Sequence, residues 1–259
     1  MPFADLTDVR IHYTLTGPES APVLVLSNSL GTNFSMWDPQ LPDFSSRFRL
    51  LRYDTRGHGN SSVPPGPYNI ELLANDLLRL LDALSLSRVN FCGLSMGGQT
   101  GIWLGLHAPH RLHKLVLCNT AAKIGVHDAW NARITTVLSG GMKEVAQAVV
   151  SRWFTPAFQA AHPEIIASAL KSLESTNPQG YAACCAAVRD FDIRNELDAI
   201  KIPTLVITGA HDPATPPADG RFLAEKIPGA RCVELNAAHL SNIEDAARFT
   251  SEVTTFLSA

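Results

Sequence analysis

One serine in the sequence stands in a setting that suits a reactive hydroxyl. Ser95 lies in the motif GLSMG (93–97), between the apolar run 88–93 and a helical pattern. A serine at a tight strand-to-helix turn lies beside free backbone N–H groups, as a nucleophile for acyl transfer requires. The flanking glycines would let the helix pack close to the sheet and tolerate the strained turn. Ordinary turns also use Gly and Ser, so the motif needs partners elsewhere in the chain.

A serine hydroxyl becomes nucleophilic when a base removes its proton, and a carboxylate must orient that base. In this kind of architecture the acid follows the serine along the chain and the histidine comes last. Asp212 stands just beyond the apolar run 203–209, and His239 stands just beyond the run 230–236. We therefore predict a catalytic triad of Ser95, Asp212 and His239.

The negative oxygen formed during acyl transfer needs two preorganised N–H donors, which make up an oxyanion hole. The first predicted donor is the amide of Met96, the residue after the nucleophile. The second is expected in the loop 28–33, which follows the apolar run 22–28, with Leu30 as the best position. Because both donors belong to the main chain, mutation of the Leu30 side chain is expected to have a mild effect.

The elements that must position these residues alternate between strands and helices. Most of the apolar runs are continuous in Val, Leu and Ile, as in parallel strands covered on both faces. Leucines at three- and four-residue steps predict a helix over 70–84. This alternation predicts an α/β fold with a doubly wound, mostly parallel sheet. The predicted strands are 9–15, 22–28, 48–54, 88–93, 114–119, 203–209 and 230–236.

The alternation of strands and helices stops between residues 121 and 190. This segment has no clear strand and resembles several short amphipathic helices interrupted by glycine and proline. We predict a core domain of residues 1–120 and 191–259, with 121–190 inserted between two core strands as a helical lid. Such an insertion lies above the strand ends where ligands of α/β proteins bind. A set of purely structural helices is the alternative.

Several motifs together resemble those of a known family. The order of GLSMGG, GAHD and AAHLSN, with YDTRGHGNSS before them, is similar to the α/β-hydrolase fold over nearly the whole chain. The finer resemblance is to 3-oxoadipate enol-lactonases and includes the loop SNSLGT, where many relatives have His-Gly in place of Asn28-Ser29. It implies Ser95 as nucleophile, Asp212 as acid, His239 as base, and Leu30 and Met96 as oxyanion donors.

The resemblance also implies an activity. The enzyme would open the lactone ring of 3-oxoadipate enol-lactone through an acyl-enzyme on Ser95, in aromatic degradation by the β-ketoadipate route. The substrate carries a carboxylate, which a closed pocket must pair with a cation or with N–H donors. Arg133 follows Trp130 by one helical step and would combine a planar fork with an aromatic wall; a solvated arginine is the alternative. Trp153 is either a pocket wall or part of the lid core.

Composition limits the other functions. A net charge of −3 without a basic block gives no reason to expect nucleic acid, and no apolar run is long enough for a membrane span. The N-terminus lacks an apolar signal core, and five cysteines without CxxC spacing suit a reduced protein, so we expect a cytoplasmic enzyme. Cys92, Cys118 and Cys232 fall in strand-like runs, where cysteine behaves as a small hydrophobe. The chemistry requires neither metal nor cofactor.

Three other functions compete with the lactonase. A general carboxylesterase or perhydrolase-like enzyme would use the same triad on neutral esters. A carbon–carbon bond hydrolase of the same fold would act on a diketone. A ligand-binding receptor would keep the pocket and turn nothing over. Dehalogenases and epoxide hydrolases are disfavoured, because they have Asp where this chain has Ser95.

Overall fold

The protein is described here by a computed structural model covering residues 2–259. The strands are β1 (Phe3–Asp5), β2 (Arg10–Thr16), β3 (Val23–Ser27), β4 (Arg49–Tyr53), β5 (Val89–Leu94), β6 (Leu112–Cys118), β7 (Thr204–Gly209) and β8 (Arg231–Leu235). All seven predicted strands are present, with ends within two residues of the prediction. The short β1 was missed because its two exposed residues leave no apolar run.

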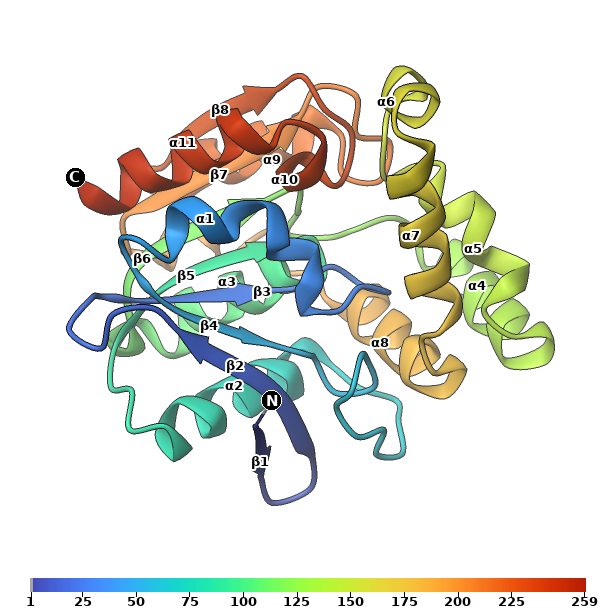
Figure 1. The fold of residues 1–259 in the computed structure, drawn as a ribbon, viewed down its shortest axis with the longest axis horizontal. Helices are drawn as coiled ribbons and strands as arrows, with labels where there is room; N and C mark the ends of the chain where they lie inside the picture. Colours follow the sequence, from blue (N-terminus) through green and yellow to red (C-terminus); the bar gives the residue numbers. More distant parts are fainter. Residues whose placement is uncertain (1) are drawn as a thin grey trace.

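The strands form one sheet in the order β1-β2-β4-β3-β5-β6-β7-β8. Strand β2 pairs antiparallel with β1 and β4, and the pairs from β4 to β8 are parallel. The doubly wound, mostly parallel sheet is therefore confirmed. Because parallel strands end at the same edge, the loops after β3, β5, β6, β7 and β8 meet there (Figure 1).

Burial explains the composition of the strands. Every residue of β5 and β7 is buried, since helices cover both faces of the central sheet. Strand β8 lies at the edge and is mostly exposed, and it includes Cys232. The sequence interpretation of Cys232 as a small hydrophobe in an apolar strand does not hold, because β8 is a mostly exposed edge strand and Cys232 is exposed on it. Cys92 and Cys118 are buried as expected.

Helices α1 and α11 lie on one side of the sheet, and α2 and α3 lie on the other (Figure 1). Helix α2 begins at Ile70 and ends at Ala83, close to the predicted span. Asn69 caps it by accepting a hydrogen bond from the Leu72 amide. These helices and the later α9 and α10 have the following bounds: α1 (Leu41–Phe44), α2 (Ile70–Ala83), α3 (Met96–His107), α9 (Pro217–Lys226), α10 (Ser241–Glu244) and α11 (Ala246–Ser258). Short 3₁₀ helices are η1 (Phe34–Gln40), η2 (Pro109–Arg111) and η3 (Leu197–Ala199).

Between β6 and β7 the chain forms five consecutive helices. They are α4 (His127–Gly140), α5 (Lys143–Val150), α6 (Pro156–Ala161), α7 (Pro163–Glu174) and α8 (Pro178–Asp190). They lie together beyond the edge of the sheet toward which β3 points (Figure 1). Prolines stand at the start of α6, α7 and α8, where the missing N–H has no cost. The division into a core and a functional lid stays a prediction.

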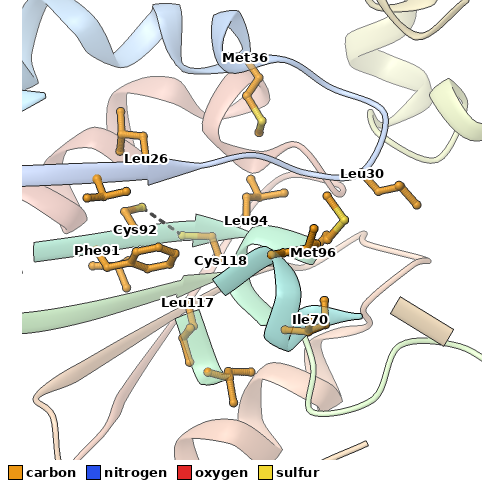
Figure 2. Packing of buried hydrophobic residues seen from close by; sticks show 14 of the residues in the cluster. Leu26, Leu30, Met36, Ile70, Phe91, Cys92, Leu94, Met96, Leu117 and Cys118 are labelled. Atoms are coloured by element: carbon orange, nitrogen blue, oxygen red, sulfur yellow. Dashed lines mark hydrogen bonds between the residues drawn. The ribbon is translucent and has the colours of Figure 1, made fainter. Parts of the chain in front are cut away.

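The hydrophobic core continues from the sheet into the segment 121–190. Around the end of β5, Leu94 and Met96 pack beside the Cys92–Cys118 pair, whose sulfur atoms are 3.7 Å apart (Figure 2). This packing anchors the strand end from which the Ser95 turn departs. None of the helices within residues 2–259 combines the length and the apolar character needed to cross a bilayer.

Candidate active site

Ser95 occupies a strained turn between β5 and α3. Its φ of 58° and ψ of −115° are rare for a residue with a side chain. Two hydrogen bonds hold this conformation: the Ser95 amide donates to the Cys118 carbonyl at 2.9 Å, and Thr120 Oγ1 donates to the Ser95 carbonyl at 2.7 Å. The neighbouring strand end therefore maintains a backbone geometry that the chain would not adopt alone.

The three surrounding glycines serve close approach. A Cβ on Gly93 would overlap the backbone of Gly97, and a Cβ on Gly97 would overlap the carbonyl of Ser27. A Cβ on Gly98 would contact the side chain of Thr120. None of these glycines has a positive φ. The positive φ of the turn is at Ser95 itself, and the glycines allow the close packing around it that the sequence predicted.

Asp212 and His239 meet although 27 residues separate them in the chain. His239 Nδ1 lies 2.8 Å from Asp212 Oδ2, and both side chains are buried. Asp212 also accepts hydrogen bonds from the amides of Ala214 and Thr215, at 2.8 and 3.1 Å, and from Thr215 Oγ1 at 2.6 Å. Burial opposes ionisation, but His239 and these donors outweigh it and lower the Asp212 pKa to about 2. The carboxylate is therefore ionised at neutral pH.

Ser95 and His239 line the same cavity. Because Nδ1 of His239 faces the ionised Asp212, that nitrogen carries the proton and Nε2 remains as the acceptor. Within residues 2–259, no hydrogen bond joins Ser95 Oγ to this ring or to any other group. Such bonds in enzymes are often long without substrate and tighten when it binds. The structure thus brings the predicted serine, acid and histidine to one place.

Sequence reasoning missed Asn119, which directly follows β6. Its Nδ2 donates to Asp212 Oδ2 at 3.0 Å and to the Ala238 carbonyl at 3.1 Å, and its Oδ1 accepts from Ser241 Oγ at 2.6 Å. Asn119 therefore connects the acid loop to the histidine loop. Its position just after a strand, like that of Asp212, was the signal that could have identified it.

The two predicted oxyanion donors lie at adjacent turns. The Gly97 amide donates to the Asn28 carbonyl at 3.1 Å, which ties the start of α3 to the loop after β3. Within the described part of the chain, the amides of Leu30 and Met96 donate no hydrogen bond. Both N–H groups are thus available beside Ser95, and Leu30 shares its cavity.

A buried histidine supports the loop that carries Leu30. The Gly31 amide donates to His58 Nε2 at 2.9 Å, so Nε2 is unprotonated and the proton is on Nδ1, 3.4 Å from the Arg56 carbonyl. Burial lowers the His58 pKa to about 4, which keeps the ring neutral near pH 7. His58 therefore holds the loop in place through the Gly31 amide.

The cavity above Ser95 has a volume of about 170 Å³. The core contributes Ser95, His239 and Leu30, and the segment 121–190 closes the other side. Its lining from that segment consists of Ile124, Gly125, Ala129, Trp130, Arg133, Val149, Arg152, Trp153, Tyr181 and Val188. The three predicted substrate contacts, Trp130, Arg133 and Trp153, are all included. Sequence reasoning did not select Arg152 or Tyr181, because neither stands in a recognisable motif.

Trp130 and Arg133 form the predicted pair on α4. The Arg133 guanidinium lies 4.6 Å from the centre of the Trp130 ring, within cation–π range. Trp130 Nε1 donates to the Ile124 carbonyl at 2.7 Å, which fixes the indole while its face contacts the arginine. The geometry suits binding of a planar anion. Among residues 2–259, no group of three or more His, Cys, Asp or Glu side chains is arranged to hold a metal ion.

Comparisons with known proteins agree with this fold and site. A family model described as the alpha/beta hydrolase fold matches residues 22–163 and 167–246, and the chain belongs to this family. More specifically, the chain is 46% identical to 3-oxoadipate enol-lactonase 2 of Acinetobacter baylyi, over 95% of this chain and 92% of that protein. It is 41% identical to 3-oxoadipate enol-lactonase 1 of the same organism, over 91% and 88% of the two chains.

A solved structure extends this likeness. The enol-lactonase from Burkholderia xenovorans LB400 is 48% identical, with a TM-score of 0.98 and coverage of 100% of both chains. The resemblance to enol-lactonases expected from the motifs is therefore confirmed.

Proposed function

We propose that this protein is a 3-oxoadipate enol-lactonase, a serine hydrolase that opens the lactone ring of its substrate to give 3-oxoadipate. The observation that carries the proposal is its likeness to enol-lactonases over nearly the whole chain. The cavity chemistry supports it: Ser95, Leu30 and His239 line one small chamber, an ionised carboxylate orients the histidine, and the amides of Leu30 and Met96 donate no hydrogen bond within residues 2–259. Ser95, His239, Asp212, Leu30 and Met96 are the residues that we assign to catalysis.

The first step is attack of Ser95 on the lactone carbonyl. His239 Nε2 removes the hydroxyl proton as the bond forms, and Asp212 stabilises the resulting imidazolium. The carbonyl oxygen becomes negative and binds the amides of Leu30 and Met96. Because these donors are already in position, little reorganisation is needed when the charge develops.

Collapse of this intermediate breaks the ring C–O bond and leaves an acyl-enzyme. The leaving group is an enol, whose delocalised charge demands less protonation by His239 than a simple alkoxide would. The enol tautomerises to a ketone while the acyl group remains on Ser95. Water, deprotonated by His239, then attacks the ester and releases the second carboxylate.

We assign the substrate carboxylate to Arg133. This guanidinium faces the catalytic cavity against Trp130, and no acidic side chain within residues 2–259 forms an ion pair with it. Trp153 would form an apolar wall beside the ring. The helices α4–α8 would act as the lid that excludes water from the reaction.

The proposal also covers where the reaction takes place and the pathway to which it belongs. We place the enzyme in the cytoplasm and in aromatic degradation by the β-ketoadipate route. The substrate is a small lactone with a carboxylate arm.

A comparison of two substrates tests the proposed function. Loss of ultraviolet absorbance by enol-lactone, generated in situ, should be much faster than hydrolysis of p-nitrophenyl acetate. Ser95→Ala should reduce lactone turnover by at least about 10⁴-fold with a nearly unchanged melting curve. Preference for the neutral ester would identify a general carboxylesterase, and substantial turnover by Ser95→Ala would show that another group is the nucleophile.

A further inference from the structure

Two arginines face the catalytic cavity, whereas the proposed substrate carries one carboxylate. Arg133 lies on α4 and Arg152 follows α5; both are half-buried and line the chamber with Ser95. Within residues 2–259, neither side chain forms an ion pair, and the Arg133 guanidinium interacts with the Tyr181 hydroxyl. This differs from Arg56 and Arg189, which contact Asp76 and Asp190 respectively.

The two guanidinium groups are close enough to oppose each other. Burial lowers the pKa of Arg152, and repulsion from Arg133 lowers it further. Asp212 acts in the opposite direction, but its oxygens already accept hydrogen bonds from five donors. Like charges in a partly buried chamber repel strongly because water screens them weakly. An anionic ligand would relieve this repulsion, and one with two charges would relieve it more.

A third polar group in the chamber lacks an acceptor for its proton. Tyr181, on α8, is fully buried; the Arg133 guanidinium lies beside its hydroxyl, which finds no acceptor within the described residues. Burial raises the Tyr181 pKa, so the group stays protonated and can donate. A buried hydroxyl without an acceptor is costly, and a native protein usually provides one. A ligand oxygen in the cavity would be that acceptor.

Ring opening changes the charge of the molecule in the chamber. The lactone has one carboxylate, and hydrolysis of the acyl-enzyme creates a second at Ser95 while releasing a proton. With a volume of about 170 Å³, the chamber holds both ends of a short open chain. One arginine would pair with the original carboxylate, and the second arginine would be free to pair with the carboxylate that hydrolysis creates.

We propose that Arg133, Arg152 and Tyr181 make the catalytic cavity a binding site for short dicarboxylates, an inference that rests on the proposed function. Arg152 receives the carboxylate that the reaction creates, and the open-chain product therefore competes with the lactone. Dianions of about six carbons bind more tightly than monoanions of equal length. The enzyme is consequently inhibited by its own class of product.

Equilibrium binding of two unreactive acids to the whole protein tests this proposal. Adipate carries two carboxylates and hexanoate one, and neither has a bond that the enzyme can cleave. Isothermal titration calorimetry should show adipate binding at least about tenfold more tightly, as an added charged contact warrants. Adipate should also inhibit p-nitrophenyl acetate hydrolysis competitively. Equal affinities for the two acids would overturn the proposal.

Two variants test whether Arg152 binds the second carboxylate of the ligand. Arg152→Gln should reduce the adipate preference to near that of a monoanion, while Lys171→Gln, which removes an exposed charge from α7, should leave it unchanged. An undiminished preference in Arg152→Gln would contradict the assignment. If that variant fails to fold, 6-hydroxyhexanoate keeps the chain and one carboxylate, has no ester to cleave, and should bind wild-type protein as weakly as hexanoate. Binding as tight as adipate would overturn the proposal.

These measurements separate the inference from the proposed function. Preferential adipate binding by a protein that does not turn over enol-lactone would refute the lactonase and leave the dianion site standing. Rapid lactone turnover by a protein that does not distinguish adipate from hexanoate would refute the dianion site alone.

Discussion

The two walls of the catalytic cavity use their polar groups in opposite ways. On the sheet side, the side chains that orient the catalytic histidine are joined in one network: Asp212 binds His239, Thr215 and Asn119, and Asn119 binds Ser241. On the side formed by segment 121–190, Arg133 and Arg152 form no ion pair and the Tyr181 hydroxyl has no acceptor within residues 2–259.

This difference separates catalysis from recognition. A network that is complete before substrate arrives holds its members in place, so little reorganisation remains for the reaction. Unpaired groups on the other wall retain their capacity for a ligand, which must supply the missing charge and acceptors. Changes on the sheet side should therefore affect kcat, and changes on the opposite side should affect KM and inhibition.

Among the changes that test this division between the walls, Asp212→Asn should have the largest effect. An amide would reverse the donor and acceptor roles at His239 Nδ1 and favour the wrong tautomer, which in a triad reduces kcat by about 10⁴-fold. Steady-state kinetics with enol-lactone should show this loss with little change in KM. A loss confined to KM would contradict the division between the two walls.

His58 makes the stability of the sheet side sensitive to pH. Its ordinary pKa is 6.5, and burial lowers the folded value to about 4. Between these values unfolding takes up a proton, so the free energy of unfolding falls as pH decreases, by up to about 1.4 kcal/mol per unit. This contribution is complete above pH 6.5 and is lost on the way to pH 4.

The change His58→Gln should remove this contribution. Urea unfolding at pH 6.5 and pH 4.5 should show that the wild-type protein loses about 2–3 kcal/mol more than the variant does. His110→Gln, at an exposed site, should behave as wild type. Parallel losses in wild type and His58→Gln would show that His58 takes up its proton in the folded state as well.

Arg133→Leu tests the recognition wall. Without the guanidinium, KM for enol-lactone should rise about tenfold or more, because a charged contact to the carboxylate is lost. The KM of p-nitrophenyl acetate should change much less. Similar increases for the charged and the neutral substrate would remove the assigned role.

The smallest effect is expected from Leu30→Ala. The proposed oxyanion donor at this position is a backbone amide, which the substitution keeps, so kcat should change by less than roughly threefold; removing a donor itself costs about 10²–10³-fold. A loss of the larger size would mean that the Leu30 side chain holds the loop in place.

Much of the sheet side could be predicted because it depends on rules of local sequence. Buried parallel strands require continuous apolar runs, and catalytic groups of this architecture follow the strands in a set order, so Asp212 and His239 could be identified from position alone. Asn119 obeys the same positional rule but was missed, since an amide after a strand has no distinctive chemistry. Tyr181 gave no signal, because nothing in a helical sequence shows which residue meets a cavity.

The sequence by itself determined the alternation of strands and helices, the tight Ser95 turn and the order of serine, acid and histidine, since each depends on residues that are neighbours or repeat at short intervals. Only the tertiary structure decided that Ser95 rather than its glycines carries the positive φ, and that Cys232 is exposed at the sheet edge. It also decided that Arg133, Arg152 and Tyr181 share one chamber. Those outcomes depend on which distant segments pack together, and burial and pairing are properties of that packing.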